Sequence, residues 1–225
     1  MPTSAVAFKS GNILLEGLVT TPDDLPGPYP VLVACHSHPS FQGNMNERIV
    51  TSICDLGETY GLATFRFNFR GTGGSEGSYD GGKGEKKDVK AALDIARKWP
   101  GFNARKITLV GYSFGAAAIM DGSPSLKKAG KFILISPPPN SASMSKLKND
   151  GRPLLIISGE KDRLSPPERI LRVFSLYKNA PQIEIIPEAD FSLAGFEDTV
   201  GKIIGRFATS QFPKNKFPHL RYFFN

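Results

Sequence analysis

From residue 30 onward, short apolar runs alternate with segments whose apolar residues recur at helical spacing. The runs PVLVACH (30–36), KITLVGYS (106–113) and PLLIISG (153–159) are almost wholly apolar, which is typical of strands buried on both faces. Helical spacing over 46–60 and 85–99 separates such runs. This alternation predicts an α/β fold, with a mostly parallel central sheet, helices on both faces and right-handed crossovers.

The remaining segments fit the same architecture. A leading hairpin is predicted where AVAFKS and NILLEGLVTT flank Gly11. Further strands are expected at LATFRFNF, KFILISP and PQIEIIP, and further helices after 113, over 166–178 and over 193–208. The segment 137–151 is expected to be a loop, too short to hold a cap domain. Any site beneath it is therefore expected to be open.

The size and charge of the chain indicate how many domains it forms and which partners it is expected to bind. With 225 residues, of which 40% are hydrophobic, it can bury one large core, so we expect a single domain over 1–212 and a basic, aromatic tail over 213–225. No apolar run approaches the roughly 20 residues that a transmembrane helix needs. The net charge of +7 comes from scattered residues without an aromatic-basic motif, so no nucleic-acid partner is expected. A protein partner stays open.

The location of the protein is predicted from its first residues and its cysteines. The start, MPTSAVAFKSGN, lacks the pattern of a secretory signal. Cys35 and Cys54 fall in a predicted strand and a predicted helix, and two thiols make no disulfide framework in a chain of this length. We expect both thiols to be free and buried, and the protein to be cytoplasmic.

The pentapeptide GYSFG (111–115) carries the strongest chemical signal. It lies between a predicted strand and the helix-forming GAAAIM, which is the context of a nucleophile elbow. Such a turn raises the Ser113 hydroxyl above the sheet edge and leaves the N–H of Phe114 at a helix start, facing a developing oxyanion. The competing interpretation is an ordinary serine in a glycine-bounded turn.

Four stretches in this order resemble the α/β-hydrolase superfamily, and in particular its small, capless branch that is similar to dienelactone hydrolases and serine aminopeptidases. They are CHSHPSFQGNMN (35–46), FNFRGTGGSEGSYDGG (67–82), GYSFG, and PLLIISGEKDRLSPP (153–167). The resemblance covers about 12–209. It implies an α/β-hydrolase fold without a cap and hydrolysis of a small ester, thioester or amide.

The resemblance also implies roles for single residues. Ser113 takes the position of the nucleophile and Asp162 that of the triad acid, in the chain order Ser, acid, His. The backbone N–H of His38 is the expected second oxyanion donor, and in the family both His36 and His38 shape that hole. Neither is expected to be the base, because the chain order argues against it.

The base is where this sequence departs from the family. The family places its histidine after the last strand, where this chain reads EADFSLAG (188–195), and Phe191 takes the histidine position. Phenylalanine cannot accept a proton. Three alternatives follow: His219 in the tail supplies the base; Asp190 or Glu188 does; or the site binds without catalysing acyl transfer.

No cofactor or metal is expected. GSYDGGKG (77–84) imitates a phosphate-binding loop but has Gly84 where the magnesium-binding Ser or Thr belongs. His36 and His38 imply no third metal ligand nearby. The sequence thus favours a serine hydrolase for a small acyl compound, with a non-catalytic binder of a small molecule or protein as the alternative.

Overall fold

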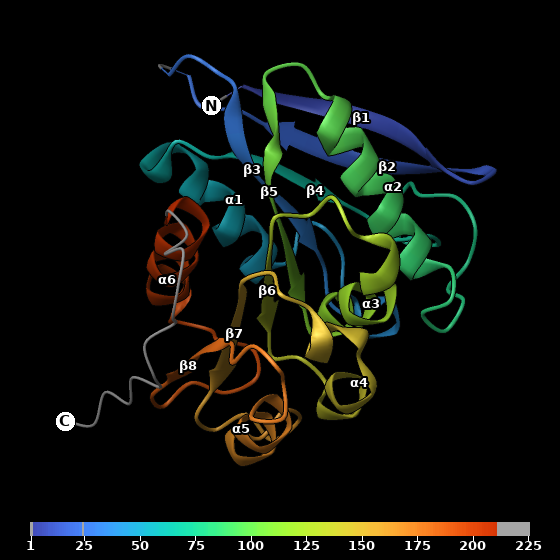
Figure 1. Ribbon diagram of the computed structural model, residues 1–225. Helices are drawn as coiled ribbons and strands as arrows, with labels where there is room; N and C mark the ends of the chain where they lie inside the picture. Colours follow the sequence, from blue (N-terminus) through green and yellow to red (C-terminus); the bar gives the residue numbers. More distant parts are fainter. Residues whose placement is uncertain (1, 24, 211–225) are drawn as a thin grey trace.

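The computed structural model describes residues 2–23 and 25–210 (Figure 1). Its centre is an eight-stranded sheet in the order β1-β2-β4-β3-β5-β6-β7-β8. The strands are β1 (Thr3–Ser10), β2 (Ile13–Thr20), β3 (Tyr29–Cys35), β4 (Ala63–Phe67), β5 (Phe102–Tyr112), β6 (Lys131–Ile135), β7 (Leu154–Gly159) and β8 (Gln182–Ile186). The strands from β4 to β8 in this order run parallel, while β1 and β2 pair antiparallel. The predicted mostly parallel sheet and its leading hairpin are confirmed.

Within the described residues, six α-helices cover the two faces of this sheet (Figure 1). They are α1 (Arg48–Tyr60), α2 (Glu85–Lys98), α3 (Phe114–Gly122), α4 (Pro139–Met144), α5 (Pro167–Phe174) and α6 (Glu197–Thr209). Helices α1 and α6 pack on one face, and α2, α3, α4 and α5 pack on the other. Alternation along β3 explains both cores, because Leu32 and Ala34 face α1 while Val31, Val33 and Cys35 face α2.

The segment 137–151 is not the plain loop predicted from its composition. It contains α4 and a 3₁₀ turn, η3 (Lys146–Asn149). Pro139 stands at the first position of α4, where a proline loses no hydrogen bond. Serines and asparagine, which are poor helix formers, dominate the rest of α4 and explain why sequence pattern missed it.

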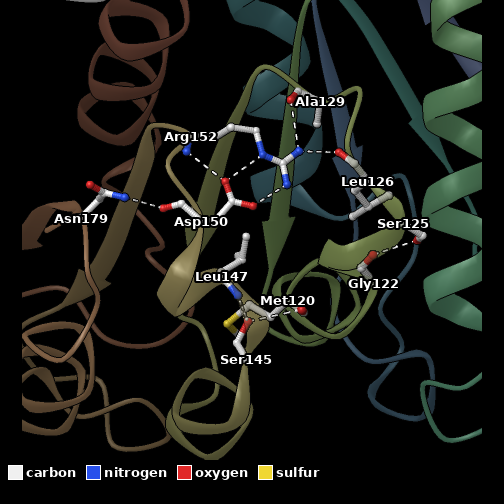
Figure 2. A network of polar contacts seen from close by, with 10 residues as sticks. All are labelled: Met120, Gly122, Ser125, Leu126, Ala129, Ser145, Leu147, Asp150, Arg152 and Asn179. Carbon is white, nitrogen blue, oxygen red and sulfur yellow. Dashed lines mark hydrogen bonds and ion pairs between the residues drawn. The ribbon is translucent and has the colours of Figure 1, made fainter.

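One arginine anchors the end of this segment to the body of the protein (Figure 2). Arg152 pairs with Asp150 through two hydrogen bonds, of 2.9 Å from Nε and 2.6 Å from Nη2. Its remaining terminal nitrogen donates to the carbonyls of Leu126 and Ala129. The guanidinium also lies 4.4 Å from the ring centroid of Phe132. The entrance to β7 is therefore fixed against the loop that precedes β6.

Helix α6 begins four residues later than the predicted start at 193. Leu193 and Gly195 have φ values of 54° and 84°, which a right-handed helix does not allow. The helix instead starts where Glu197 and Asp198 place negative charge in its first turn. At its other end, the Lys131 ammonium donates to the carbonyls of Phe207 and Ser210 at 2.7 and 2.8 Å.

Both cysteines lie in elements that the structure describes. Cys35 in β3 and Cys54 in α1 are both buried and free, as predicted. No helix within 2–23 and 25–210 is long and apolar enough to cross a bilayer. The predicted tail, 213–225, lies outside the described residues.

Candidate active site

Ser113 stands at the sharp turn between β5 and α3. Its φ of 51° and ψ of −105° lie in a region that is costly for a residue with a side chain. The Ser113 N–H donates to the carbonyl of Ile135 at 2.8 Å, and its own carbonyl accepts from the N–H of Ala117 at 3.1 Å. The half-buried serine is thus held in the strained strand–turn–helix geometry that GYSFG predicts.

The two glycines of the pentapeptide are required by close backbone contacts. A Cβ on Gly111 would lie 2.6 Å from the backbone nitrogen of Ala116, and a Cβ on Gly115 would lie 2.3 Å from the carbonyl oxygen of Cys35. Real Cβ atoms do not approach backbone atoms this closely. The elbow therefore packs directly against the end of β3, and only glycine fits at either position.

The proposed oxyanion donors are the backbone N–H groups of Phe114 and His38. Phe114 is the first residue of α3, so its N–H has no partner within the helix. His38 caps the 3₁₀ turn η1 (Pro39–Phe41), and nothing among the described residues accepts a hydrogen bond from its N–H. The rings of the two residues pack at a centroid distance of 4.9 Å. Both donors therefore come from residues that are neighbours in space.

His36 is a structural residue in this site. It is fully buried, its Nδ1–H donates to the carbonyl of Ser37 at 2.7 Å, and its Nε2 accepts from the N–H of Phe69 at 3.0 Å. Burial lowers the pKa of His36 to about 4. With both nitrogens engaged, the ring ties the end of β3 to the segment after β4 and has no lone pair left for Ser113.

His38 is engaged in the same way. Its Nδ1 accepts from the N–H of Ser40 at 3.1 Å, so in the neutral ring the proton is on Nε2. That Nε2–H then donates to the hydroxyl of Tyr79 at 3.1 Å. The side chain consequently offers no free acceptor for the Ser113 proton.

Asp162, the predicted acid, lies in the loop after β7 with only 2% of its surface exposed. Its Oδ1 accepts from the N–H groups of Leu164 and Ser165, at 2.9 and 2.7 Å. Its Oδ2 is buried and has no hydrogen-bond partner among the described residues. A buried carboxylate oxygen without a protein partner is free to accept a hydrogen bond.

Phe191 lies in the segment after β8, which packs against the loop of Asp162. The N–H of Lys161 donates to the carbonyl of Ala189 at 2.8 Å, and a Cβ on Gly159 would lie 2.4 Å from the same oxygen. The Phe191 ring packs against Tyr112 at a centroid distance of 5.3 Å. This segment therefore adjoins both the loop of Asp162 and the elbow, where it contributes an apolar ring.

The carboxylates considered as bases are engaged elsewhere. Asp190 is exposed, and its Oδ1 accepts from the N–H and hydroxyl of Ser192 at 2.9 and 2.7 Å. These bonds, the hydroxyl first, lower the pKa of Asp190 and make it a weaker base. Glu188 pairs with Lys161. No described side chain is hydrogen-bonded to the hydroxyl of Ser113, and His219 lies outside the described residues.

Two tyrosines of the site were missed by sequence reasoning. Tyr112 precedes the serine and donates from its hydroxyl to the carbonyl of Phe191 at 3.1 Å; its burial raises its pKa. Tyr79 belongs to the glycine-rich loop after β4 and contacts the rings of His38 and Phe114, at 4.9 and 5.7 Å. Its only sequence signal is a lone aromatic residue in SEGSYDGG.

The site offers no evident place for a metal ion. Among the described residues, no group of at least three His, Cys, Asp or Glu side chains could hold one.

The architecture is that of α/β hydrolases that lack a lid. A solved structure of an α/β serine hydrolase homologue from Coxiella burnetii is 28% identical, with a TM-score of 0.82 over 92% of this chain and 98% of that one. A lidless α/β serine hydrolase from Xanthomonas campestris is 24% identical, with a TM-score of 0.78 over 94% of this chain and 98% of that one. The predicted fold class is therefore confirmed.

The family is shown by the sequence itself. The pattern of the dienelactone hydrolase family matches residues 80–202, and the chain belongs to this family. An uncharacterized protein from Rickettsia prowazekii is 35% identical over 139 residues, which are 60% of this chain and 58% of that protein. The resemblance inferred from the four sequence stretches is thus confirmed at the level of the family and the hydrolase class.

Proposed function

We propose that the protein is a serine hydrolase that cleaves a small, uncharged ester, thioester or amide through Ser113. The observation that carries the proposal is the strained backbone of Ser113, at a φ of 51°, held between Ile135 and Ala117 at the start of α3. Strain of this kind persists where the surrounding structure enforces it and is concentrated at functional sites.

In the proposed reaction, Ser113 Oγ bonds to the carbonyl carbon of the substrate. The electron pair of the carbonyl double bond moves to oxygen, where the N–H groups of Phe114 and His38 stabilise the charge. Collapse of this intermediate breaks the bond to the leaving group, which takes up a proton, and leaves an acyl-serine. Water then attacks the acyl-serine, which releases the acid and restores the hydroxyl.

The proton of the Ser113 hydroxyl needs an acceptor, and the described residues supply none. Asp162 Oδ2 can accept a hydrogen bond from an imidazole, but the adjoining segment carries Phe191, which has no group that donates one. We infer that hydrolysis, where it occurs, uses either His219 or a slow route without a side-chain base. An oxyanion hole and substrate binding alone can leave about 10³-fold acceleration over water.

A second function is favoured by Phe191 itself. A protein that only binds its ligand needs no base, and an apolar ring packed on Tyr112 closes the position where a base would stand. In this alternative the same site retains an acyl compound, or the surface around it meets a protein partner, without turnover. The buried, unpaired thiols of Cys35 and Cys54 support a reducing compartment such as the cytoplasm for either function.

Covalent labelling separates the two functions. Incubation with a fluorophosphonate, followed by intact-mass measurement, should give one adduct on the wild type and none on Ser113→Ala. No adduct on a folded wild-type protein would contradict the hydrolase and favour the binder.

The labelling rate also tests the base. A decrease of about 100-fold or more in His219→Gln would assign the base to His219, because general bases contribute at least this factor. An unchanged rate would exclude His219 and leave the route without a side-chain base.

A further inference from the structure

A cluster of aromatic rings adjoins the proposed oxyanion hole. The His38 ring is its centre, with centroids 4.9 Å from Phe114, 4.9 Å from Tyr79 and 5.3 Å from Phe41. Phe114 and His38 are also the residues whose N–H groups are proposed to bind the carbonyl oxygen of the substrate. A group attached to that carbonyl carbon therefore meets this cluster first.

Exposure rises steadily through the aromatic cluster. Phe114 is 9% exposed, Tyr79 43% and Phe41 82%, so the rings lead from the buried elbow to the protein surface. A fully buried ring cluster would be ordinary core packing. Rings that remain open to water beside a strained serine provide apolar surface whose free energy is lowered when a ligand covers it.

Hydrogen bonds hold the exposed rings in place. The His38 ring is fixed by the N–H of Ser40 on one side and by the hydroxyl of Tyr79 on the other. The loop that carries Tyr79 is fixed by Glu85, a buried residue whose carboxylate accepts from the N–H groups of Asp80 and Gly82, both at 2.8 Å. A platform that is ordered before binding loses little entropy when a ligand arrives.

Other large apolar side chains are exposed at the same edge of the sheet. Met144 is 77% exposed in the segment after β6, and Leu164 is 67% exposed in the loop after β7. Phe41 and Tyr79 follow β3 and β4, so the four residues follow the carboxyl ends of parallel strands. Such ends meet at one edge, which is where ligands bind in open α/β sheets.

We propose that the aromatic cluster is a recognition surface for a planar aromatic acyl group, so that the substrate class is an uncharged aryl or arylalkenyl ester, thioester or amide. Phe41 and Tyr79 stack against the ring of the substrate, and Phe114 contacts the substrate next to the reacting carbonyl. An aromatic ligand is favoured over an alkyl one because ring pairs gain stabilisation beyond the area that they bury. This inference rests on the proposed function only for the position of the carbonyl.

Binding of two uncharged amides tests the inference without requiring turnover. Dissociation constants for cinnamamide and hexanamide are measured by NMR titration on the wild type and on Phe41→Ala, Tyr79→Leu and Tyr79→Phe. We expect the wild type to prefer cinnamamide and the variants Phe41→Ala and Tyr79→Leu each to lose roughly three- to tenfold of that affinity. Tyr79→Phe keeps the ring but loses the hydroxyl that fixes His38, so its affinity for cinnamamide should lie between those of the wild type and Tyr79→Leu.

A matched variant away from the aromatic cluster is the control. Leu176→Ala removes an equally exposed apolar side chain that precedes β8, away from this edge, and should bind cinnamamide as the wild type does. Equal affinity for the two amides in the wild type, or unchanged cinnamamide binding in Phe41→Ala and Tyr79→Leu, would overturn the inference. Both variants change surface-exposed rings, and circular dichroism confirms that they are folded.

The result separates this inference from the proposed hydrolysis. Preference for cinnamamide without a fluorophosphonate adduct would support the aromatic recognition surface and contradict hydrolysis through Ser113. An adduct together with equal affinity for both amides would support hydrolysis through Ser113 and contradict the aromatic recognition surface.

Discussion

The hydroxyl of Tyr112 donates a hydrogen bond to the backbone carbonyl of Phe191 at 3.1 Å, and the two rings pack in a tilted arrangement, with centroids 5.3 Å apart and planes at 31°. The residue next to the proposed nucleophile thus holds the segment in which the family's base is expected. The Tyr112–Phe191 contact places position 191 beside the elbow through backbone as well as side chain. A different side chain at 191 would therefore start from the same backbone position.

Phe191→His should create the missing base. We expect an imidazole at this position to reach the unpaired Oδ2 of Asp162 and raise kcat/KM for an activated ester by about 100-fold or more. Ester hydrolysis followed by absorbance measures the effect, with Phe196→His, in the same segment, as the matched control. If the gain persisted in a Phe191→His protein that also carries Asp162→Asn, the role given to Asp162 would be wrong.

Gly115→Ala should distort the elbow and destabilise the protein. The new Cβ would lie 2.3 Å from the carbonyl oxygen of Cys35, and backbone on both sides leaves little room to move. We expect a loss of about 2 kcal/mol or more in the free energy of unfolding, measured by urea titration. Gly151→Ala, whose Cβ would meet only the Asn179 amide nitrogen at 3.9 Å, is the control and should change little.

The protein should lose stability on acidification because of His36. Burial lowers its pKa to about 4 from the usual 6.5, so between these values the unfolded chain binds a proton that the folded one does not. Stability is therefore fully present above pH 6.5 and decreases as the pH falls to 4, by on the order of 3 kcal/mol from this residue.

Urea titrations at several pH values measure the His36 contribution. His36→Asn should be less stable than the wild type at neutral pH, because it breaks the bonds to Ser37 and Phe69. Its stability should also depend less on pH between 6.5 and 4. Parallel curves for the two proteins would show that other groups carry the acid sensitivity.

Arg152→Lys should weaken the anchor of the segment before β7. A lysine keeps the charge but cannot donate to both oxygens of Asp150 and to the carbonyls of Leu126 and Ala129 at once (Figure 2). We expect a loss of about 1–3 kcal/mol in the free energy of unfolding, since buried acceptors lose their donor. Arg105→Lys, at an exposed position, should be neutral.

The fold was predictable because its signal is local. Apolar runs and helical spacing are properties of neighbouring residues, so β3, β7 and α2 were located from sequence to within about two residues. The errors have equally local causes. Positive φ values at Leu193 and Gly195 delay α6, and they follow from turn geometry that an apolar residue at 193 does not reveal.

The site was only partly predictable, for a different reason. Ser113 and Asp162 lie in short motifs with fixed spacing, and the structure places them in the turn and loop that the motifs imply. Tyr79 was missed because its contact with His38 joins residues 41 positions apart in two separate loops. Ring contacts of this kind depend on how loops meet in space, and no local pattern encodes them.

Gly115 packs its backbone against Cys35, whereas Phe191 occupies a surface segment after the last strand. The backbone geometry of the proposed nucleophile is thus fixed by the packing of the fold, whereas the side chain at position 191 is not. We therefore expect substitutions at 191 to change the chemistry of the proposed site and to leave the elbow in place.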